Sequence, residues 1–305
     1  MKPPRVSVVI PAYAAAAFIE KTLDSVAAQT FKDFELVVVD DGSPDDTKSV
    51  VDRWFARTGT RGTCVRRENG RIAVARNTGL KAATGALIAL LDHDDLWRPE
   101  KLALCVAEFD AHPEAVLVGH HTDVVREGRV VAVERKGPAV ERMYDRLLFE
   151  ANAVAPSGAV FRRDKALEIG GFREEPQYNT VEDYDFWMRL ARTGPFRFLD
   201  SVLSSYIVLP GSASQRVEYH HSNLESLLRD HFADRLGPAP GVWDRLRMRR
   251  RLSFVYRSAV AALLEPASDA ALRRTNARRR LAAWPLSARN HGRAAQALLA
   301  DISGR

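Results

Sequence analysis

Along the first third of the chain, the pattern of apolar and polar positions switches repeatedly between that of strands and that of helices. Short apolar runs bounded by polar residues predict buried strands at 6–10, 35–39, 63–67 and 86–91. The segments between them have helical spacing, at 14–29, 43–57 and 72–83, with Ser43 as the expected N-cap of the second helix. Because strands alternate with helices, we expect βαβ units and a mostly parallel sheet.

The rest of the chain is less regular. Apolar runs predict strands at 115–121, 129–134 and 156–161, and helical spacing predicts helices at 99–112, 164–169 and 182–193. A loop is expected at 210–214, beyond which the chain becomes helical and basic. We therefore expect an α/β domain over 1–215, with halves at 1–120 and 121–215, followed by a helical extension over 216–305.

Composition places the chain among ordinary globular proteins. Hydrophobic residues make up 46% of its 305 residues and charged residues 28%, which excludes a disordered or collagen-like protein. The two cysteines, Cys64 and Cys105, are too few for a disulfide framework or a cysteine-based zinc site and suit a reducing compartment. No apolar run has the length of a signal peptide core or a membrane span, so we expect a cytoplasmic protein.

Charge is concentrated at the C-terminal end. The whole chain carries +6, but residues 241–305 hold 14 arginines and four acids, so this stretch carries +10 and the first 240 residues −4. Such a segment suits phosphates, acidic lipid headgroups or an acidic partner, and we expect no nucleic acid. One hypothesis is that 243–300 docks on the anionic inner face of a membrane. A solvated helix face, a packed appendage or a dimer contact are the alternatives.

Acidic residues follow two of the predicted strands, where ligands bind in sheets of this kind. Asp92 and Asp94 lie two positions apart after the fourth strand, so their carboxylates point to the same side of an extended chain. Paired carboxylates together with substrate phosphates are typical ligands of Mg²⁺ or Mn²⁺. Capping of the helix near 99 is the alternative, and it stays open for Asp95. Asp40 and Asp41 follow the second strand, and one of them is expected to accept hydrogen bonds from a base or ribose, with stabilisation of a helix dipole as the alternative.

Five segments together resemble the family 2 inverting glycosyltransferases of GT-A fold. They are Val-Ile-Pro-Ala-Tyr at 9–13, Val-Val-Asp-Asp-Gly-Ser at 38–43, Ala-Arg-Asn-Thr-Gly at 75–79, Leu-Asp-His-Asp-Asp-Leu-Trp at 91–97 and Glu-Asp-Tyr-Asp-Phe-Trp at 182–187. The resemblance covers about 6–215. It implies a Rossmann-like mixed sheet flanked by helices, with a nucleotide-sugar half over 1–120 and an acceptor half over 121–215.

The resemblance also implies a donor site. It assigns the lining of the nucleotide base and ribose to Pro11, Ala12, Tyr13 and Asp41, and puts Arg76 close to the bound nucleotide. Asp92 and Asp94 form the Asp-x-Asp motif for Mn²⁺ or Mg²⁺, with Asp94 the direct ligand. His93, between them, belongs to the donor site and is expected to point away from the metal.

On the acceptor side, the resemblance makes Asp183 the general base, next to Glu182, with Asp185 as a fallback. A structural alternative is that Thr180 and Asp183 form a capping box. Gln177 and Tyr178 are expected to face the acceptor.

The expected reaction moves a hexose-type sugar, from a UDP-sugar above all, to a hydroxyl of a carbohydrate or lipid-linked acceptor in surface polysaccharide or glycolipid synthesis. Two alternatives remain. One is a nucleotidyltransferase, which the Pro-Ala-Tyr-Ala-Ala-Ala-Ala stretch at 11–17 argues against because it lacks a phosphate loop. The other is a non-catalytic nucleotide-sugar binder.

The chain departs from the family pattern at three positions outside the five segments. Arg71 stands where the family often has Gly, and Ile207 and Leu209 stand where it often has Arg and His. Any role that those Arg and His residues play in relatives is therefore in question here. Leu209 is the best support for the non-catalytic alternative.

Overall fold

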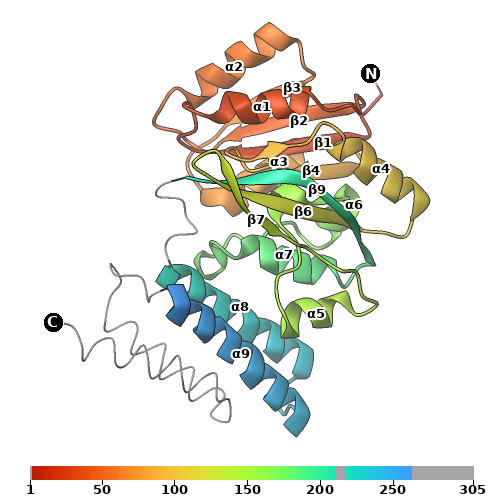
Figure 1. Cartoon of the computed structure of the whole chain (residues 1–305), viewed down its shortest axis with the longest axis vertical. Coiled ribbons are helices and arrows are strands. Elements are labelled where there is room, and N and C mark those ends of the chain that lie inside the picture. The colour runs from red at the N-terminus through yellow and green to blue at the C-terminus, as the bar shows by residue number, and fades with distance from the viewer. Residues whose placement is uncertain (1, 210–216, 263–305) are drawn as a thin grey trace, which may run out of the picture. The chain divides into compact units, whose positions relative to one another are not determined.

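A computed structural model describes residues 2–209 and 217–262 of the chain. The loop predicted at 210–214 and the arginine-rich segment beyond 262 lie outside the described residues. Within these ranges, the chain forms a mixed α/β fold with a central sheet flanked by helices (Figure 1).

Four parallel strands make one side of the sheet, as the pattern predicts. They are β1 (Val6–Ala12), β2 (Phe34–Asp40), β3 (Gly62–Arg66) and β4 (Leu87–Leu90). Their order is β3-β2-β1-β4, and every residue of β1 and β4 is buried. Continuous burial is what a parallel strand covered on both faces requires, which explains the unbroken apolar runs.

The other side of the sheet is mixed. After β4 come β8 (Val160–Arg162), β6 (Leu117–Arg126), β9 (Phe196–Val208) and β5 (Leu96–Trp97), and β7 (Arg129–Glu134) pairs with β6. β8 runs antiparallel to both β4 and β6, whereas β9 is parallel to β6. The sheet of the described residues is therefore wholly parallel on one side and mixed on the other.

Helices cover both faces of the parallel strands. Side chains of α1 (Ile19–Ala27), α2 (Thr47–Thr58) and α4 (Lys101–Ala111) share one core with β1 residues such as Val8 and Ile10. On the other face lies α3 (Arg71–Ala82), whose Gly79 approaches Val9 so closely that a Cβ atom there would lie 2.3 Å from the valine side chain. Close packing explains why a glycine stands inside this helix.

Two predicted helix starts are wrong, for one physical reason. The first helix begins at Ile19 rather than near Ala14, and the second at Thr47 rather than after Ser43. The amides of Ala14 and Ala16 donate hydrogen bonds to the side chains of Ser43 and Asp45. These side chains hold both segments in a loop, which cannot be read from helical periodicity.

Further short elements lie along the chain between the strands named above. They are α5 (Met143–Phe149), α6 (Arg163–Glu168), α7 (Glu182–Leu190) and the 3₁₀ turns Pro156–Gly158 and Pro176–Tyr178. The strand predicted at 156–161 thus begins as a 3₁₀ turn. The pattern did not predict α5, β5 or β9.

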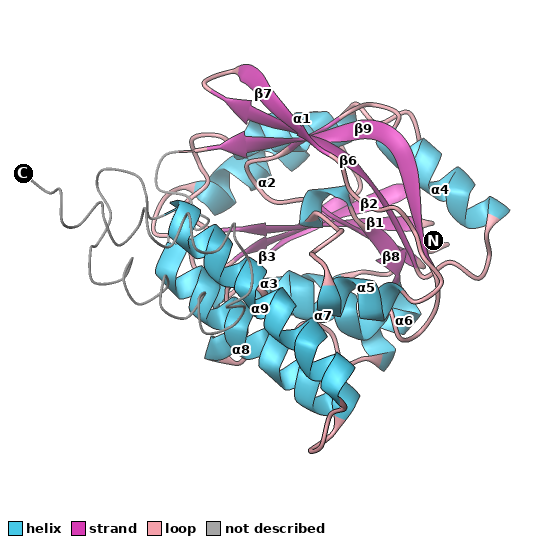
Figure 2. Cartoon of the chain, turned by 60° about the horizontal axis from the view of Figure 1, so that its bottom comes forward, coloured by secondary structure: helices cyan, strands magenta, loops and turns pink. Residues whose placement is uncertain are grey.

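The chain divides into two compact units. The first contains Met1–Leu147, Asn152–Glu174 and Glu182–Pro210, and the second Leu148–Ala151, Glu175–Val181 and Gly211–Arg305. Within the second unit, α8 (Val217–Leu236) and α9 (Val242–Ala262) lie side by side (Figure 2). Phe149 packs against Phe232 of α8, and the Arg247 guanidinium of α9 lies 3.7 Å from the centre of the Phe149 ring. Two short segments from within 1–215 therefore group with the C-terminal helices.

None of the helices in the described ranges combines the length and the hydropathy that a bilayer span requires.

Candidate functional site

The carboxyl ends of β2, β1 and β4 bring the predicted donor residues to one edge of the sheet. Ala12 of β1 lies opposite Asp40 of β2, and β4 pairs with β1 on the other side. His93, in the loop after β4, lies within hydrogen-bond distance of the Pro11 carbonyl, at 3.0 Å from Nδ1. The chain segments that follow three neighbouring strands therefore converge here.

Asp41 is buried and its carboxylate is held by the protein itself. Oδ1 accepts hydrogen bonds from Arg67 Nη1 at 2.7 Å and from the Gly70 amide at 3.0 Å. Asp40, also buried, accepts a hydrogen bond from the Ser43 amide and pairs with Arg66. These contacts fix the loop before α3. The side chain of Tyr13, directly after β1, is exposed.

The acidic cluster after β4 divides into partly open and fully buried carboxylates. Asp92 and Asp94 are half-buried, while Asp95 is buried. Burial raises the pKa of Asp94, and the charge of Asp92 adds to this effect although His93 opposes it. The negative charge of Asp94 is therefore only partly balanced by positive charge nearby.

Asp95 does not cap the following helix, so this alternative is wrong. The helix α4 begins after Glu100 without a side-chain cap. Instead, Asp95 accepts a hydrogen bond from the Ser157 hydroxyl at 2.5 Å and from the Ile207 amide of β9 at 3.1 Å. Burial, together with the charges of Asp92 and Asp94, raises the pKa of Asp95 well above its usual range.

His93 turns toward the first strand. Its ring stacks on Phe18 with centroids 5.6 Å apart, and because the Pro11 carbonyl can only accept, Nδ1 carries the proton in that hydrogen bond. The Thr22 hydroxyl donates to the His93 carbonyl. The side chain of His93 is thus engaged with β1 and α1.

Arg76 connects the acidic cluster to the second acidic motif. Its guanidinium is buried and donates from Nη2 to Asp92 Oδ1 at 2.9 Å and from Nη1 to Glu182 Oε1 at 2.7 Å. Burial opposes the charged form of Arg76, but Asp92 and Glu182 outweigh it and raise its pKa. Burial raises the pKa of Glu182, with Asp183 adding to the effect and Arg76 opposing it. Two acidic motifs distant in the sequence therefore share one buried cation.

Asp183 and Asp185, at the start of α7, have different environments. Asp185 is fully buried and pairs with Arg189 Nε at 2.7 Å and Arg173 Nη1 at 3.3 Å. Asp183 is half-buried and close enough to Arg76 to influence its pKa. The Thr180 hydroxyl makes no hydrogen bond within the described part of the chain, so the capping box is not formed. Asp185 serves as a structural ion-pair partner.

Of the two further acceptor-side residues, Gln177 is exposed and Tyr178 is buried. The Tyr178 hydroxyl donates to Asp230 Oδ2 of α8 at 2.9 Å, within the second unit. Tyr178 therefore fixes the segment that carries Gln177.

The family is decided by a sequence comparison. The model of glycosyl transferase family 2 matches residues 7–170. The chain belongs to this family. The match contains the first four of the five segments described above.

Known relatives agree with this assignment. The chain is 34% identical over 242 residues to the uncharacterised protein y4gI of Sinorhizobium fredii, covering 77% of this chain and 26% of that protein. It is 28% identical over 200 residues to a chondroitin synthase of Escherichia coli, covering 65% of this chain and 28% of the synthase. The chain thus matches about a quarter of each relative's length.

Solved structures show the same fold. S. aureus TarS 1–349 in complex with UDP-GlcNAc superposes with a TM-score of 0.65 at 18% identity, covering 92% of this chain and 89% of that one. A mannosyltransferase from Pyrobaculum calidifontis in complex with GDP-Man and Mn²⁺ gives 0.60 at 24% identity, covering 100% and 89%. The chain therefore has the GT-A fold.

Three residues of the site were not foreseen. Ser157 donates to Asp95 and accepts from the Asp92 amide, and Ile207 contributes only its backbone amide. Asn77 exchanges hydrogen bonds with the backbone of Phe172, at 2.7 and 2.8 Å. Ser157 stands between Pro156 and Gly158, a signal of a tight turn that was available in the sequence.

Arg71, which replaces a common glycine, has a φ of +72°. This is the left-handed conformation that glycine adopts without strain. The departure from the family pattern therefore changes the side chain while keeping the turn.

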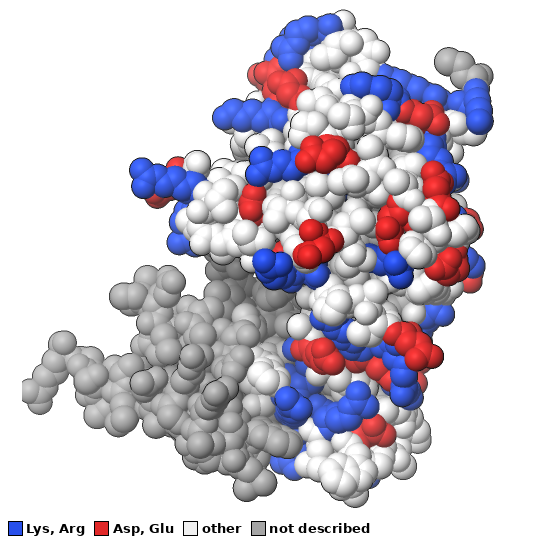
Figure 3. All heavy atoms as spheres, turned by 45° about the vertical axis from the view of Figure 1, so that its right-hand side comes forward, with Lys and Arg blue, Asp and Glu red and all other residues white. Residues whose placement is uncertain are grey.

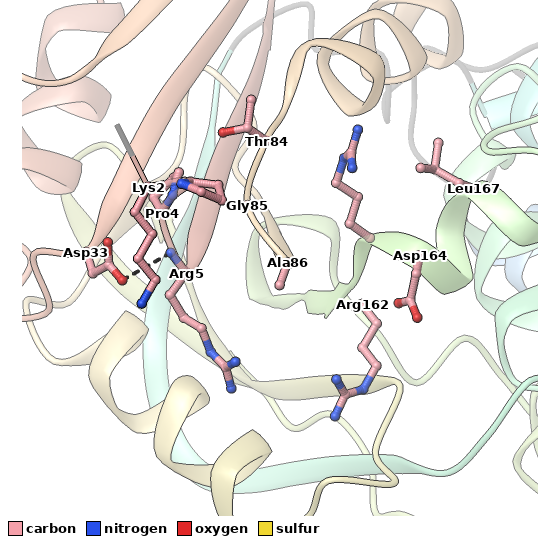
Figure 4. A pocket seen from close by; sticks show the side chains of 12 residues that line it. Lys2, Pro4, Arg5, Asp33, Thr84, Gly85, Ala86, Arg162, Asp164 and Leu167 are labelled. Carbon is pink, nitrogen blue, oxygen red and sulfur yellow. Dashed lines mark hydrogen bonds between the residues drawn. The ribbon is translucent and has the colours of Figure 1, made fainter.

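Among the residues that the structure describes, no three His, Cys, Asp or Glu side chains converge as a ready-made metal site. A hollow of about 510 Å³ lies elsewhere, lined by Arg5, Asp33, Thr84 and Arg162 among others (Figure 4). Arg5 precedes β1 and Thr84 precedes β4, so this hollow lies at the amino ends of the strands. Because Asp41 and Asp92 follow the carboxyl ends, the hollow is separate from the candidate site.

Proposed function

We propose that this glycosyltransferase moves a sugar from a nucleotide-diphosphate donor, a UDP-sugar first, to a hydroxyl of a carbohydrate or lipid-linked acceptor, with inversion. The observation that carries this proposal is the bridge from Asp92 through Arg76 to Glu182. Because one guanidinium pairs with Asp92 and with Glu182, the bridge supports a common site for the donor and the acceptor. TarS with UDP-GlcNAc and the mannosyltransferase with GDP-Man support the donor class.

Asp94 and Asp92 are the proposed ligands of Mn²⁺ or Mg²⁺. The residues fit such an ion, because two hard carboxylates stand together after β4 and the cation that pairs with Asp92, Arg76, is shared with Glu182. One or two carboxylates plus substrate phosphates are the usual magnesium environment. When bound, a divalent cation supplies positive charge to the departing diphosphate. Pro11, Ala12, Tyr13, Asp41 and His93 are the proposed surroundings of the base and ribose.

Asp183 is the proposed general base. As the acceptor oxygen bonds to the anomeric carbon, its proton moves to a carboxylate oxygen of Asp183, and the bond to the diphosphate breaks with its electron pair leaving on the diphosphate. Attack opposite the leaving group inverts the anomeric centre. The choice of Asp183 is supported by the full commitment of Asp185 to Arg189 and Arg173 and by the missing capping box.

The test is thermal unfolding with UDP, GDP, dTDP and CMP, each with and without Mn²⁺. One diphosphate is expected to stabilise the wild type, by about 2.7 kcal/mol at a hundred times its Kd. Asp94→Asn should lose the part of this gain that depends on Mn²⁺. Asp164→Asn, which changes an exposed acid of α6, is the matched control and should keep it. If no nucleotide stabilises the wild type under either condition, the donor assignment is wrong.

A further inference from the structure

The helix α8 holds the chain segment that leads into the acidic motif of α7. Asn223 of α8 donates from Nδ2 to the Asn179 carbonyl at 2.6 Å. His220, one turn earlier, lies 3.1 Å from the Thr180 carbonyl through Nδ1. Because a carbonyl only accepts, both side chains act as donors to the backbone of this segment. Both contacts lie within the second unit.

Two more contacts fasten the same segment. The Tyr178 hydroxyl donates to Asp230, and Asn179 Nδ2 donates to the Tyr219 hydroxyl at 3.3 Å. Asn223 is buried, so its hydrogen bond is shielded from water. Buried hydrogen bonds are costly to leave unmade, and the segment is therefore fixed to α8 along three successive residues.

A strained backbone conformation at Thr180 indicates that α8 holds this segment firmly in place. Thr180 has a φ of +72°, a genuine outlier for a β-branched residue. Such conformations cost free energy and persist only where the surroundings impose them. The contacts from α8 to Asn179 and Thr180 are those surroundings, and Glu182 follows two residues later in the chain.

We propose that α8 is a positioning element of the transferase: it fixes segment 175–181, which continues directly along the chain into the acidic motif that contains Asp183. Asn223 and His220 are positioning residues in this sense, since they hydrogen-bond to the backbone of the segment that precedes the acidic motif. The inference rests on the proposed function for its catalytic part. It gives the C-terminal helices a role in turnover.

The first test measures hydrogen exchange in the full chain by mass spectrometry. Asn223→Asp keeps the shape of the side chain but turns the donor into an acceptor that faces the Asn179 carbonyl. Peptides covering 175–184 are expected to exchange about fivefold faster or more, the factor for one lost hydrogen bond, while peptides of α2 stay unchanged. Ser222→Ala, an exposed neighbour on α8, is the control and should exchange like the wild type. Unchanged exchange in Asn223→Asp would overturn the inference.

The second test separates positioning from loss of stability. Donor binding is measured as the Kd of the nucleoside diphosphate with Mn²⁺. Turnover is measured as diphosphate release with alkyl glycosides of glucose, galactose, mannose and N-acetylglucosamine, and with water. Asn223→Asp is expected to lower kcat on the order of tenfold and to keep the Kd within about twofold, because small misplacements of a catalytic group reduce rate strongly.

A destabilised variant completes the second test. Leu228→Ala removes a fully buried side chain of α8 that makes none of these hydrogen bonds, so it should lower Tm while keeping kcat at 15 °C. A kcat loss in Leu228→Ala as large as in Asn223→Asp would overturn the positioning role. If the wild type neither binds a nucleotide nor turns over, the proposed function fails, and the exchange experiment alone decides whether α8 fixes the segment.

Discussion

Buried charged side chains in this protein differ in whether a partner faces them. Asp185 is surrounded by two arginines. Lys101, equally buried, has no hydrogen-bond partner for Nζ in the described structure and lies 3.5 Å from the centre of the Trp97 ring. Burial lowers the pKa of Lys101 to about 7. The stacked indole compensates only part of the lost hydration, so Lys101 costs stability at neutral pH.

Lys101→Met is expected to stabilise the protein, by on the order of 1 to 3 kcal/mol near pH 7, because it fills a similar volume without a buried polar group. Chemical denaturation measures this gain. Lys81→Met, at an exposed position of α3, is the control and should change stability by less than about 0.5 kcal/mol. A loss of stability in Lys101→Met would mean that the amine has a favourable partner.

The stability gain should also depend on pH. The pKa of Lys101 is lowered in the folded state, so between pH 7 and its ordinary value of 10.5 the unfolded chain binds more protons and wild-type stability rises with pH. The advantage of Lys101→Met should therefore shrink from pH 7 to pH 9. The two thiols, whose pKa values are raised by burial to about 11, oppose this trend only above pH 9. A constant difference between the two proteins over this range would contradict the assignment.

Asp183→Asn should lower sugar transfer by about 10²- to 10⁴-fold, since an amide cannot accept the acceptor proton. The Kd for the nucleoside diphosphate should stay within about twofold, because Asp183 is proposed to act on the acceptor. Transfer is measured as diphosphate release, and binding by calorimetry. Retention of wild-type transfer in Asp183→Asn would remove Asp183 from the mechanism.

Single residues were predictable where their local sequence determines their position. Asp92 and Asp94 follow an apolar run, so their place at the strand end follows from the pattern. The pairing of Arg76 with Glu182 joins residues 106 positions apart, and that of Asp95 with Ile207 spans 112 positions. Such contacts depend on the strand order of the sheet, which no local pattern specifies.

At the scale of elements, β1, β2 and β4 were predictable because both of their faces are buried. The strand β9 was missed because its residues are mostly half-buried and Asp200 and several serines interrupt its apolar positions. It nevertheless carries the Ile207 amide that binds Asp95. The contacts that the mixed side of the sheet contributes to the site could therefore be identified only from the structure.

The bridge made by Arg76 ties α3, the loop after β4 and α7 together. Arg76→Met should destabilise the protein by about 3 to 5 kcal/mol, because it leaves the buried Glu182 carboxylate without its cation. Arg5→Met is the matched control. It breaks the exposed pair with Asp110 and should cost less than about 1 kcal/mol. The free energy of unfolding of both variants is measured with denaturant. Equal losses of this free energy in Arg76→Met and Arg5→Met would show that the bridge does not join these elements.

At the scale of the whole molecule, charge and exposure differ along the chain. Figure 3 shows acidic and basic side chains interspersed over the face that it displays. The excess of +10 lies in 241–305, of which α9 is the described part. Some of its arginines are engaged, since Arg247 lies over Phe149 and Arg251 is buried. At the start of α9, Val242 and Trp243 are 71% and 79% exposed.

Exposed Trp243 beside an arginine-rich segment leads us to expect binding to anionic membranes. The full chain should co-sediment with phosphatidylglycerol-containing vesicles at physiological salt, and the emission of Trp243 should shift to shorter wavelength. Replacing Arg278, Arg279 and Arg280, which lie outside the described residues, by Gln should weaken binding on the order of 100-fold, since each cation contributes about 1 kcal/mol.

Two controls make the membrane experiment decisive. Trp243→Phe should abolish the spectral shift while leaving co-sedimentation largely intact, because the cations supply most of the attraction. High salt should release the protein, since screening shortens the reach of surface charge. If the full chain stays in the supernatant at physiological salt, the positive charge of 241–305 serves packing or another partner. Transfer to a lipid-linked acceptor would then need a different means of reaching the membrane.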